Sequence, residues 1–134
     1  MIVVDTNIIG YLYLTSDRSM QAEQALVKDR QWAAPLLWRS ELRNVLALYI
    51  RKQILSLTEA QQIMGEAISL MQNQEYDVKS LHVLRLVASS TCSAYDCEFV
   101  ALAQDLDVRL VTVDRQILNQ FPTIAVSLEA FVGS

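Results

Sequence analysis

Met1-Ile2-Val3-Val4-Asp5-Thr6-Asn7 is the stretch of sequence that decides the fold of this chain. Its first four residues are apolar and rich in β-branched side chains, which predicts a short buried strand. Asp5, Thr6 and Asn7 favour a turn or the cap of a helix, so we expect a helix over residues 8–14. A strand that leads directly into a helix is typical of the start of an α/β domain.

The rest of the chain continues this alternation. Further strands are expected at residues 31–34, 75–78, 109–112 and 123–126. Further helices are expected at residues 19–27, 36–51, 58–71, 81–88, 93–106 and 115–118. Strands that alternate with helices imply a mainly parallel sheet with helices on its faces. The length of 134 residues, without a repeat or a linker, suits a single domain over 1–134.

Composition and charge exclude several classes of protein. Hydrophobic residues make up 52% and charged residues 19% of the chain, which is typical of a globular domain and not of a disordered one. The net charge of −4 means that any contact with nucleic acid must be local. Asp5 interrupts the first apolar run, which excludes a signal peptide or membrane span there, so we expect a cytoplasmic protein. Cys92, Cys97 and the single His82 predict neither a zinc site nor a disulfide framework.

Four acidic residues stand beside the apolar elements. Asp5 ends the first strand, Glu41 and Asp96 lie near the starts of helices, and Asp114 follows the strand expected at 109–112. Parallel strands place their carboxyl ends at one edge of a sheet, which allows the four side chains to meet in one crevice. Each acid also has a structural explanation, as a helix cap or a solvated helix residue. A shared crevice accounts for all four positions at once.

Carboxylates that converge repel one another, and a divalent cation relieves that repulsion. Oxygen ligands without a neighbouring His or Cys favour Mg²⁺ or Mn²⁺ over zinc. Thr6, Asn7 and Thr112 are small hydrogen-bonding residues beside the acids, and such residues orient carboxylates around a metal. Because one or two such ions can ionise a water and neutralise a phosphodiester, the pattern indicates metal-assisted hydrolysis.

Four blocks of this sequence, taken in order, resemble the PIN domain family. They are Val3-Val4-Asp5-Thr6-Asn7, Ser40-Glu41-Leu42-Arg43-Asn44-Val45-Leu46, Tyr95-Asp96-Cys97-Glu98-Phe99-Val100-Ala101-Leu102-Ala103 and Leu110-Val111-Thr112-Val113-Asp114. Their order, their spacing and the length of the chain are similar to those of VapC-type nucleases, the toxins of type II toxin–antitoxin systems. The resemblance covers essentially the whole chain.

The resemblance implies a fold, an activity and a set of site residues. The implied fold is a three-layer α/β/α sandwich around a mainly parallel sheet. The implied activity is a metal-dependent endoribonuclease that hydrolyses RNA phosphodiester bonds with Mg²⁺ or Mn²⁺ and is neutralised by a cognate antitoxin. The implied metal-binding and catalytic residues are Asp5, Glu41, Asp96 and Asp114, and the supporting residues are Thr6, Asn7 and Thr112.

Two further residues near the acids are possible members of the site. Glu98 is either an extra acid or a surface residue, because a two-residue step along a helix turns it away from Asp96. Arg115 directly follows Asp114 and is therefore the best candidate for a contact with RNA. The other basic candidates, each of which can instead pair with an acid, are Arg39, Arg43, Arg51, Lys52, Arg85 and Arg109.

The helices expected at residues 8–14 and 36–51 are apolar on nearly all sides. Such helices must be covered on more than one side, either inside the domain or by a homodimer partner or an antitoxin. Tyr11, Tyr13, Trp38 and Tyr49 are the aromatic residues expected in that interface. An alternative function is therefore a PIN-fold interaction protein with little or no turnover, although the presence of all four acids favours the nuclease. A phosphohydrolase with an aspartyl nucleophile fits less well, because Asp5-Thr6-Asn7 lacks a second aspartate two residues on.

Overall fold

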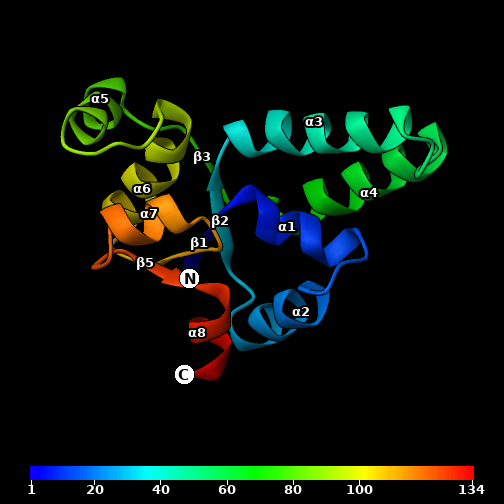
Figure 1. Cartoon of the computed structure of the whole chain (residues 1–134), viewed down its shortest axis with the longest axis horizontal. Coiled ribbons are helices and arrows are strands. Elements are labelled where there is room, and N and C mark those ends of the chain that lie inside the picture. Colours follow the sequence, from blue (N-terminus) through cyan, green and yellow to red (C-terminus); the bar gives the residue numbers. More distant parts are fainter.

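The computed structural model describes all 134 residues, labelled by element in Figure 1. The strands are β1 (Ile2–Val4), β2 (Trp32–Pro35), β3 (Glu75–Tyr76), β4 (Leu110–Thr112) and β5 (Ala125–Ser127). The helices are α1 (Thr6–Tyr13), α2 (Ser19–Lys28), α3 (Leu37–Arg51), α4 (Leu57–Leu70), α5 (Ser80–Ala88), α6 (Ala94–Leu106), α7 (Arg115–Gln120) and α8 (Leu128–Gly133). Every expected strand and helix is present, with ends that differ by at most two residues.

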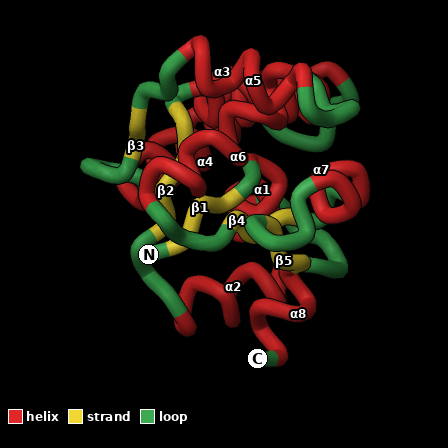
Figure 2. The backbone as a smooth tube through the Cα atoms, turned by 90° about the vertical axis from the view of Figure 1, so that its left-hand side faces the viewer, coloured by secondary structure: helices red, strands yellow, loops and turns green.

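The strands form one sheet in the order β3-β2-β1-β4-β5, and every neighbouring pair is parallel. Figure 2 shows the strands side by side in this order. The central strand β1 places Val3 opposite Ala33 of β2 and Leu110 of β4. All three residues of β1 are buried, which is the uniform apolar pattern of a parallel strand covered on both faces. The expected parallel sheet is confirmed.

Helices cover both faces of the sheet, so the domain is a three-layer α/β/α sandwich (Figure 1). On one face, α6 packs across β1, β2 and β4, with α5 against it. On the other face, α1 packs against α2, α3 and α4, while α8 packs against α2, β4 and β5. Trp32, Trp38 and Phe99 are the largest side chains of the single core that these layers enclose. None of the helices combines the length and the hydropathy needed to cross a bilayer.

The last helix, α8, is absent from the sequence-based expectation. Ser127 caps it, because the Ser127 hydroxyl accepts a hydrogen bond from the Ala130 backbone N–H at 3.1 Å. The Lys28 ammonium of α2 donates to the backbone carbonyls of Phe131 and Ser134 at 2.6 and 2.7 Å. Cations stabilise the carboxyl end of a helix, so this short helix depends on a contact from a distant segment.

The structure corrects part of the predicted aromatic interface. Trp38 is fully buried inside the domain, where its indole N–H donates to the Glu75 carboxylate at 2.8 Å. Tyr11, Tyr13 and Tyr49 are partly buried and pack against the core. Because α1 and α3 pack on each other and on α4, the domain itself covers much of their apolar surface.

The strand order positions the candidate site. The chain leaves the central strand β1 toward β2 and β3, and then returns to β4 on the opposite side of β1. In open parallel sheets, ligands bind outside the carboxyl ends of the strands at such a reversal. Asp5 directly follows β1, and Asp114 lies two residues after Thr112 at the end of β4.

Candidate active site

Asp5 is the most constrained of the four acids. It is 8% exposed, and each of its carboxylate oxygens accepts one hydrogen bond. The Thr6 backbone N–H donates to Oδ1 at 2.7 Å, and the Thr112 hydroxyl donates to Oδ2 at 2.8 Å. Burial, followed by the nearby charges of Glu41 and Asp96, raises the pKa of Asp5 to about 6, although the two hydrogen bonds lower it.

Glu41 reaches Thr6 from the second turn of α3. The Thr6 hydroxyl donates to Glu41 Oε1 at 2.7 Å, so Thr6 contacts Asp5 through its backbone and Glu41 through its side chain. Glu41 is half-buried, and this burial, together with the charge of Asp96, raises the pKa of its carboxyl. Glu41 is therefore not simply a solvated helix residue.

Thr112 connects Asp5 to Asp114. Its fully buried hydroxyl donates to Asp5 and accepts a hydrogen bond from the Asp114 backbone N–H at 3.0 Å. Asp114 caps α7, because its Oδ1 accepts from the Ile117 backbone N–H at 3.0 Å. Asp5 and Asp114 therefore combine a capping position with a place at the carboxyl edge of the sheet.

Asp96 enters from the first turn of α6, on the opposite face of the sheet from α1. Ser93 caps this helix by accepting a hydrogen bond from the Asp96 backbone N–H at 3.1 Å. The Asp96 side chain is thus not the cap. It is half-buried, and burial followed by the charge of Asp114 raises the pKa of its carboxyl.

The four acids form one negatively charged group without a protein counter-charge. Asp114 raises the pKa of Asp96, Asp96 raises the pKa values of Asp5 and Glu41, and Glu41 raises the pKa of Asp5. The three salt bridges of the chain all join other residues. Partly buried like charges without a cation are costly, so this arrangement favours the binding of a positive ligand.

A comparison with known protein families matches residues 2–122 to the PIN domain. The chain belongs to the PIN domain family. A similar protein, Ribonuclease VapC3 of Pyrobaculum aerophilum, is 29% identical over 126 residues, which cover 92% of this chain and 96% of that protein.

Two crystal structures share this PIN fold. PAE2754 from Pyrobaculum aerophilum superimposes with a TM-score of 0.78 at 20% identity, covering 98% of this chain and 93% of that one. FitAcB from Neisseria gonorrhoeae superimposes with a TM-score of 0.74 at 14% identity, covering 96% and 99%. At these identities the two structures establish the fold alone.

The donor set of this PIN domain fits a hard divalent cation. All four side chains offer carboxylate oxygens, the ligands that Mg²⁺ and Mn²⁺ prefer. As the side chains stand, no three of them are close enough to hold an ion together. Mg²⁺ usually keeps several waters and takes only one or two protein carboxylates, with substrate phosphates supplying the rest, so a closed cage is not required.

Two other predicted residues, Asn7 and Glu98, lie close to residues of this group. Asn7 is exposed and lines a pocket next to Thr6. Glu98 is partly buried, and burial, followed by the charges of Glu41 and Asp77, raises the pKa of its carboxyl.

Arg115 lies in a depression of about 200 Å³ near the carboxyl ends of β4 and β5. Arg18, which the sequence did not suggest, lines the same depression. No local signal marks Arg18, because only the packing of α2 brings it to this edge. Arg39 is instead paired with Glu75, with Nη2 and Oε1 2.6 Å apart.

Proposed function

We propose that this PIN domain is a metal-dependent endoribonuclease and the toxin of a toxin–antitoxin pair. The observation that carries the proposal is the buried Asp5 carboxylate, fixed by two hydrogen bonds and flanked by acids that no basic residue neutralises. A bound cation would relieve the repulsion within such a group. The similarity to Ribonuclease VapC3 over nearly the whole chain supports RNA as the substrate.

In this proposal each acid has a defined role. Asp5, Asp96 and Asp114 hold the ion, while Glu41 completes the group or positions the attacking water. Bound Mg²⁺ or Mn²⁺ supplies positive charge to the phosphoryl oxygens and lowers the pKa of water. The Thr6 and Thr112 hydroxyls keep Glu41 and Asp5 oriented, because each donates a short hydrogen bond to one carboxylate oxygen.

An acidic domain that binds RNA needs cations close to its active site. Arg18 and Arg115 are both exposed and line one depression next to Asp114. We place the RNA backbone there, because exposed guanidinium groups bind phosphates well.

The proposed biological setting includes a cytoplasmic location, a homodimer and a cognate antitoxin. Several large apolar side chains are exposed on α3, α4 and α5, and such surface is commonly covered by a protein partner. These exposed side chains are Leu48, Leu57, Leu81 and Leu84. The alternative function, an interaction protein without turnover, predicts the same exposed apolar surfaces. It also predicts that replacing the four acids does not change RNA cleavage.

The test is cleavage of total cellular RNA by the purified protein, with Mg²⁺ or Mn²⁺ and with a chelator. The parent is expected to cleave only with metal. Asp5→Asn should lower the rate by about 100-fold or more, because the change is nearly isosteric but removes the central charge. Asp107→Asn is the matched control, since Asp107 is exposed at the far end of α6 in a left-handed conformation that Asn also accepts.

Equal cleavage by Asp5→Asn, or cleavage that survives the chelator, would contradict the proposal. If the parent protein is correctly folded but does not cleave RNA, the result would favour the alternative function, an interaction protein without turnover. As a cellular test, expression of the parent should arrest growth, whereas expression of Asp5→Asn should not.

A further inference from the structure

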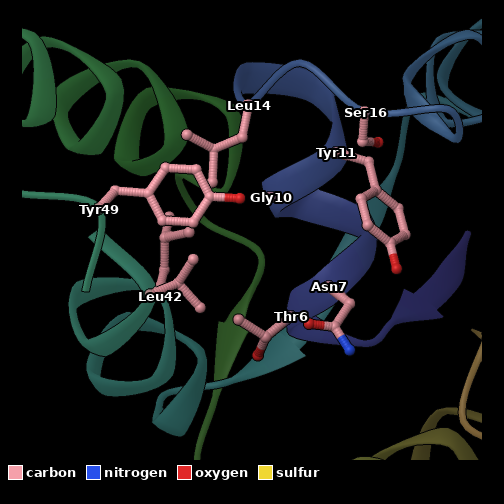
Figure 3. Close-up of a pocket in the computed structure, with 9 residues that line it drawn as sticks. Thr6, Asn7, Gly10, Tyr11, Leu14, Ser16, Leu42 and Tyr49 are labelled. Atoms are coloured by element: carbon pink, nitrogen blue, oxygen red, sulfur yellow. The ribbon is translucent and has the colours of Figure 1, made fainter. Parts of the chain in front are cut away.

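A small pocket lies between α1 and α3 (Figure 3). One of its lining residues, Thr6, donates hydrogen bonds to Asp5 and Glu41. The volume of the pocket is about 130 Å³, and no charged side chain lines it. Thr6 and Asn7 form one end, and Tyr11 and Tyr49 contribute aromatic surface from the two helices. Drug-sized ligands need about 300 Å³ or more, so this pocket suits a single small group.

Gly10 shapes the pocket although the fold does not require a glycine there. It lies within α1, where glycine is a poor helix former, and its φ is not positive. A Cβ at this position would meet only Leu42 Cδ1, at 4.0 Å, which is an ordinary contact. Since neither backbone conformation nor packing explains the glycine, its effect is to leave open space in the wall of the pocket.

Thr6 is shared by the pocket and the acidic group. The same residue binds Asp5 and Glu41 and lines the pocket, so a molecule with a phosphate at the acids places its neighbouring group within reach of the pocket. The lining itself carries no charged side chain, so we expect that group to be uncharged. The nearest cation is Arg18, which lies over the Tyr11 ring at 5.9 Å and donates to the Tyr11 hydroxyl at 3.4 Å. Partly exposed tyrosine rings favour a flat aromatic group.

We propose that this pocket receives one base of the RNA substrate, from a nucleotide beside the phosphodiester that is cleaved. The inference rests on the proposed function and adds a specificity-determining subsite to it. Proteins commonly recognise single-stranded RNA by stacking bases on aromatic side chains and by hydrogen bonding to their edges. Tyr11 and Tyr49 supply the aromatic surface, and the Asn7 amide supplies a donor and an acceptor at the pocket mouth.

The first test measures binding without cleavage. Each of the four ribonucleosides, which contain no phosphodiester, is titrated into the protein while the ring signals of Tyr11 and Tyr49 are followed by NMR. We expect at least one nucleoside to shift both rings and to saturate. Gly10→Ala should weaken that binding by about tenfold, on the order of the loss of one stacked base. Gly65→Ala is the matched control, because a Cβ there meets nothing within 4 Å on the exposed face of α4.

The second test measures kcat/KM on RNA oligonucleotides that differ only in the bases next to the cleaved bond. Both alanine variants should be at least as stable as the parent, but only Gly10→Ala should lose about tenfold in kcat/KM and flatten the base preference. If the parent binds a nucleoside in this pocket but cleaves no RNA, the proposed nuclease activity is contradicted, whereas the proposed base-binding pocket is supported.

Two results would overturn the base pocket. The first is that no nucleoside shifts Tyr11 or Tyr49; if an amphipathic peptide with a leucine or tryptophan anchor shifts both rings instead, the pocket belongs to a protein partner. The second is a Gly10→Ala variant with parental nucleoside affinity, kcat/KM and base preference.

Discussion

At the residue scale, two threonine hydroxyls fix the geometry of the acids. Thr6 contacts both Asp5 and Glu41, and Glu41 lies 35 positions after Thr6 in the sequence. The Thr112 hydroxyl donates to Asp5, which lies 107 positions before it. Each hydroxyl orients a carboxylate that burial makes reluctant to ionise. Removal of a group that orients a metal ligand commonly lowers metal affinity or activity by about 10- to 100-fold.

Replacing Thr112 tests this role. Thr112→Val keeps the shape of the side chain but leaves one Asp5 oxygen and the Asp114 backbone N–H without their partner. We expect the free energy of unfolding to fall by about 1–3 kcal/mol, which urea denaturation measures. Metal affinity should fall as well. Thr112→Ser keeps the hydroxyl and should retain most of both properties, and a valine variant as stable as the parent would contradict the role of this hydroxyl.

The pKa of Asp5 predicts opposite pH responses with and without metal. Because the folded-state pKa is raised from 3.8 to about 6, the stability contributed by the protonated carboxyl is lost as pH rises through about 6. When a chelator keeps the protein free of metal, lowering the pH from 7 to 5 should therefore raise the melting temperature of the parent relative to that of Asp5→Asn. Metal affinity should instead weaken below about pH 6, because protons compete for the same oxygens. Calorimetry checks both directions, and a parent and an Asp5→Asn variant with identical pH profiles would contradict the assigned pKa.

At the scale of elements, the short edge strand β3 is held to α3 by Glu75. Its carboxylate accepts from the buried Trp38 indole and pairs with Arg39, and the Arg39 guanidinium holds the pKa of Glu75 below its usual range. This contact explains how a strand of two residues persists at the edge of the sheet. It also removes Arg39 from the cations available to RNA.

Truncating Glu75 tests this connection. Glu75→Ala leaves the Trp38 indole N–H buried and unpaired, so we expect a loss of about 2 kcal/mol in the free energy of unfolding. Glu75→Gln still offers an acceptor and should cost less. Glu23→Ala, at an exposed position of α2, serves as the control for a lost surface carboxylate. Equal stability of the Ala and Gln variants would show that the indole bond contributes nothing.

Most elements were predictable because their signals are local. The uniform apolar character of β1 and β4 and the periodicity of the helices predicted the α/β order. Asp5 and Ser93 are residue types that favour helix caps, and both cap helices in the structure. The sequence did not predict the ends of β3 and β5, because the pairing of these strands with their neighbours fixes them. It also did not predict α8, which is held by the contacts of Lys28 from a distant segment. The burial of Trp38 was missed because its indole partner, Glu75, lies 37 positions away.

At the scale of the whole molecule, the fold brings four acids close enough to raise one another's pKa, and two arginines line a depression beside Asp114. The order of the sheet brings the carboxyl ends of β1 and β4 together, and α6 adds Asp96 from the opposite face. The sequence indicated the four acids and their small neighbours, since all stand beside apolar elements. It did not indicate which hydroxyl holds which acid, the position of Arg18, or the pocket at Gly10, because each depends on how distant segments pack.

The two arginines should govern the affinity for RNA. Arg115→Gln and Arg18→Gln are each expected to weaken binding, and each should reduce the slope of log affinity against log salt by about one. Fluorescence anisotropy with a labelled RNA at several salt concentrations measures both quantities. Arg51→Gln, at the far end of α3, is the control and should change neither. An unchanged slope in both site variants would place the RNA backbone elsewhere.

The central claim is that Asp5, Glu41, Asp96 and Asp114 together bind a divalent cation, and Mn²⁺ anomalous diffraction tests it most directly. Crystals of the parent grown with Mn²⁺ should show an anomalous peak in the crevice within coordination distance of Asp5 and at least one of the other three carboxylates. Crystals of Asp5→Asn grown in the same way should lose that peak. A parent crystal in which Mn²⁺ is ordered only elsewhere, or a peak that persists unchanged in Asp5→Asn, would contradict the claim.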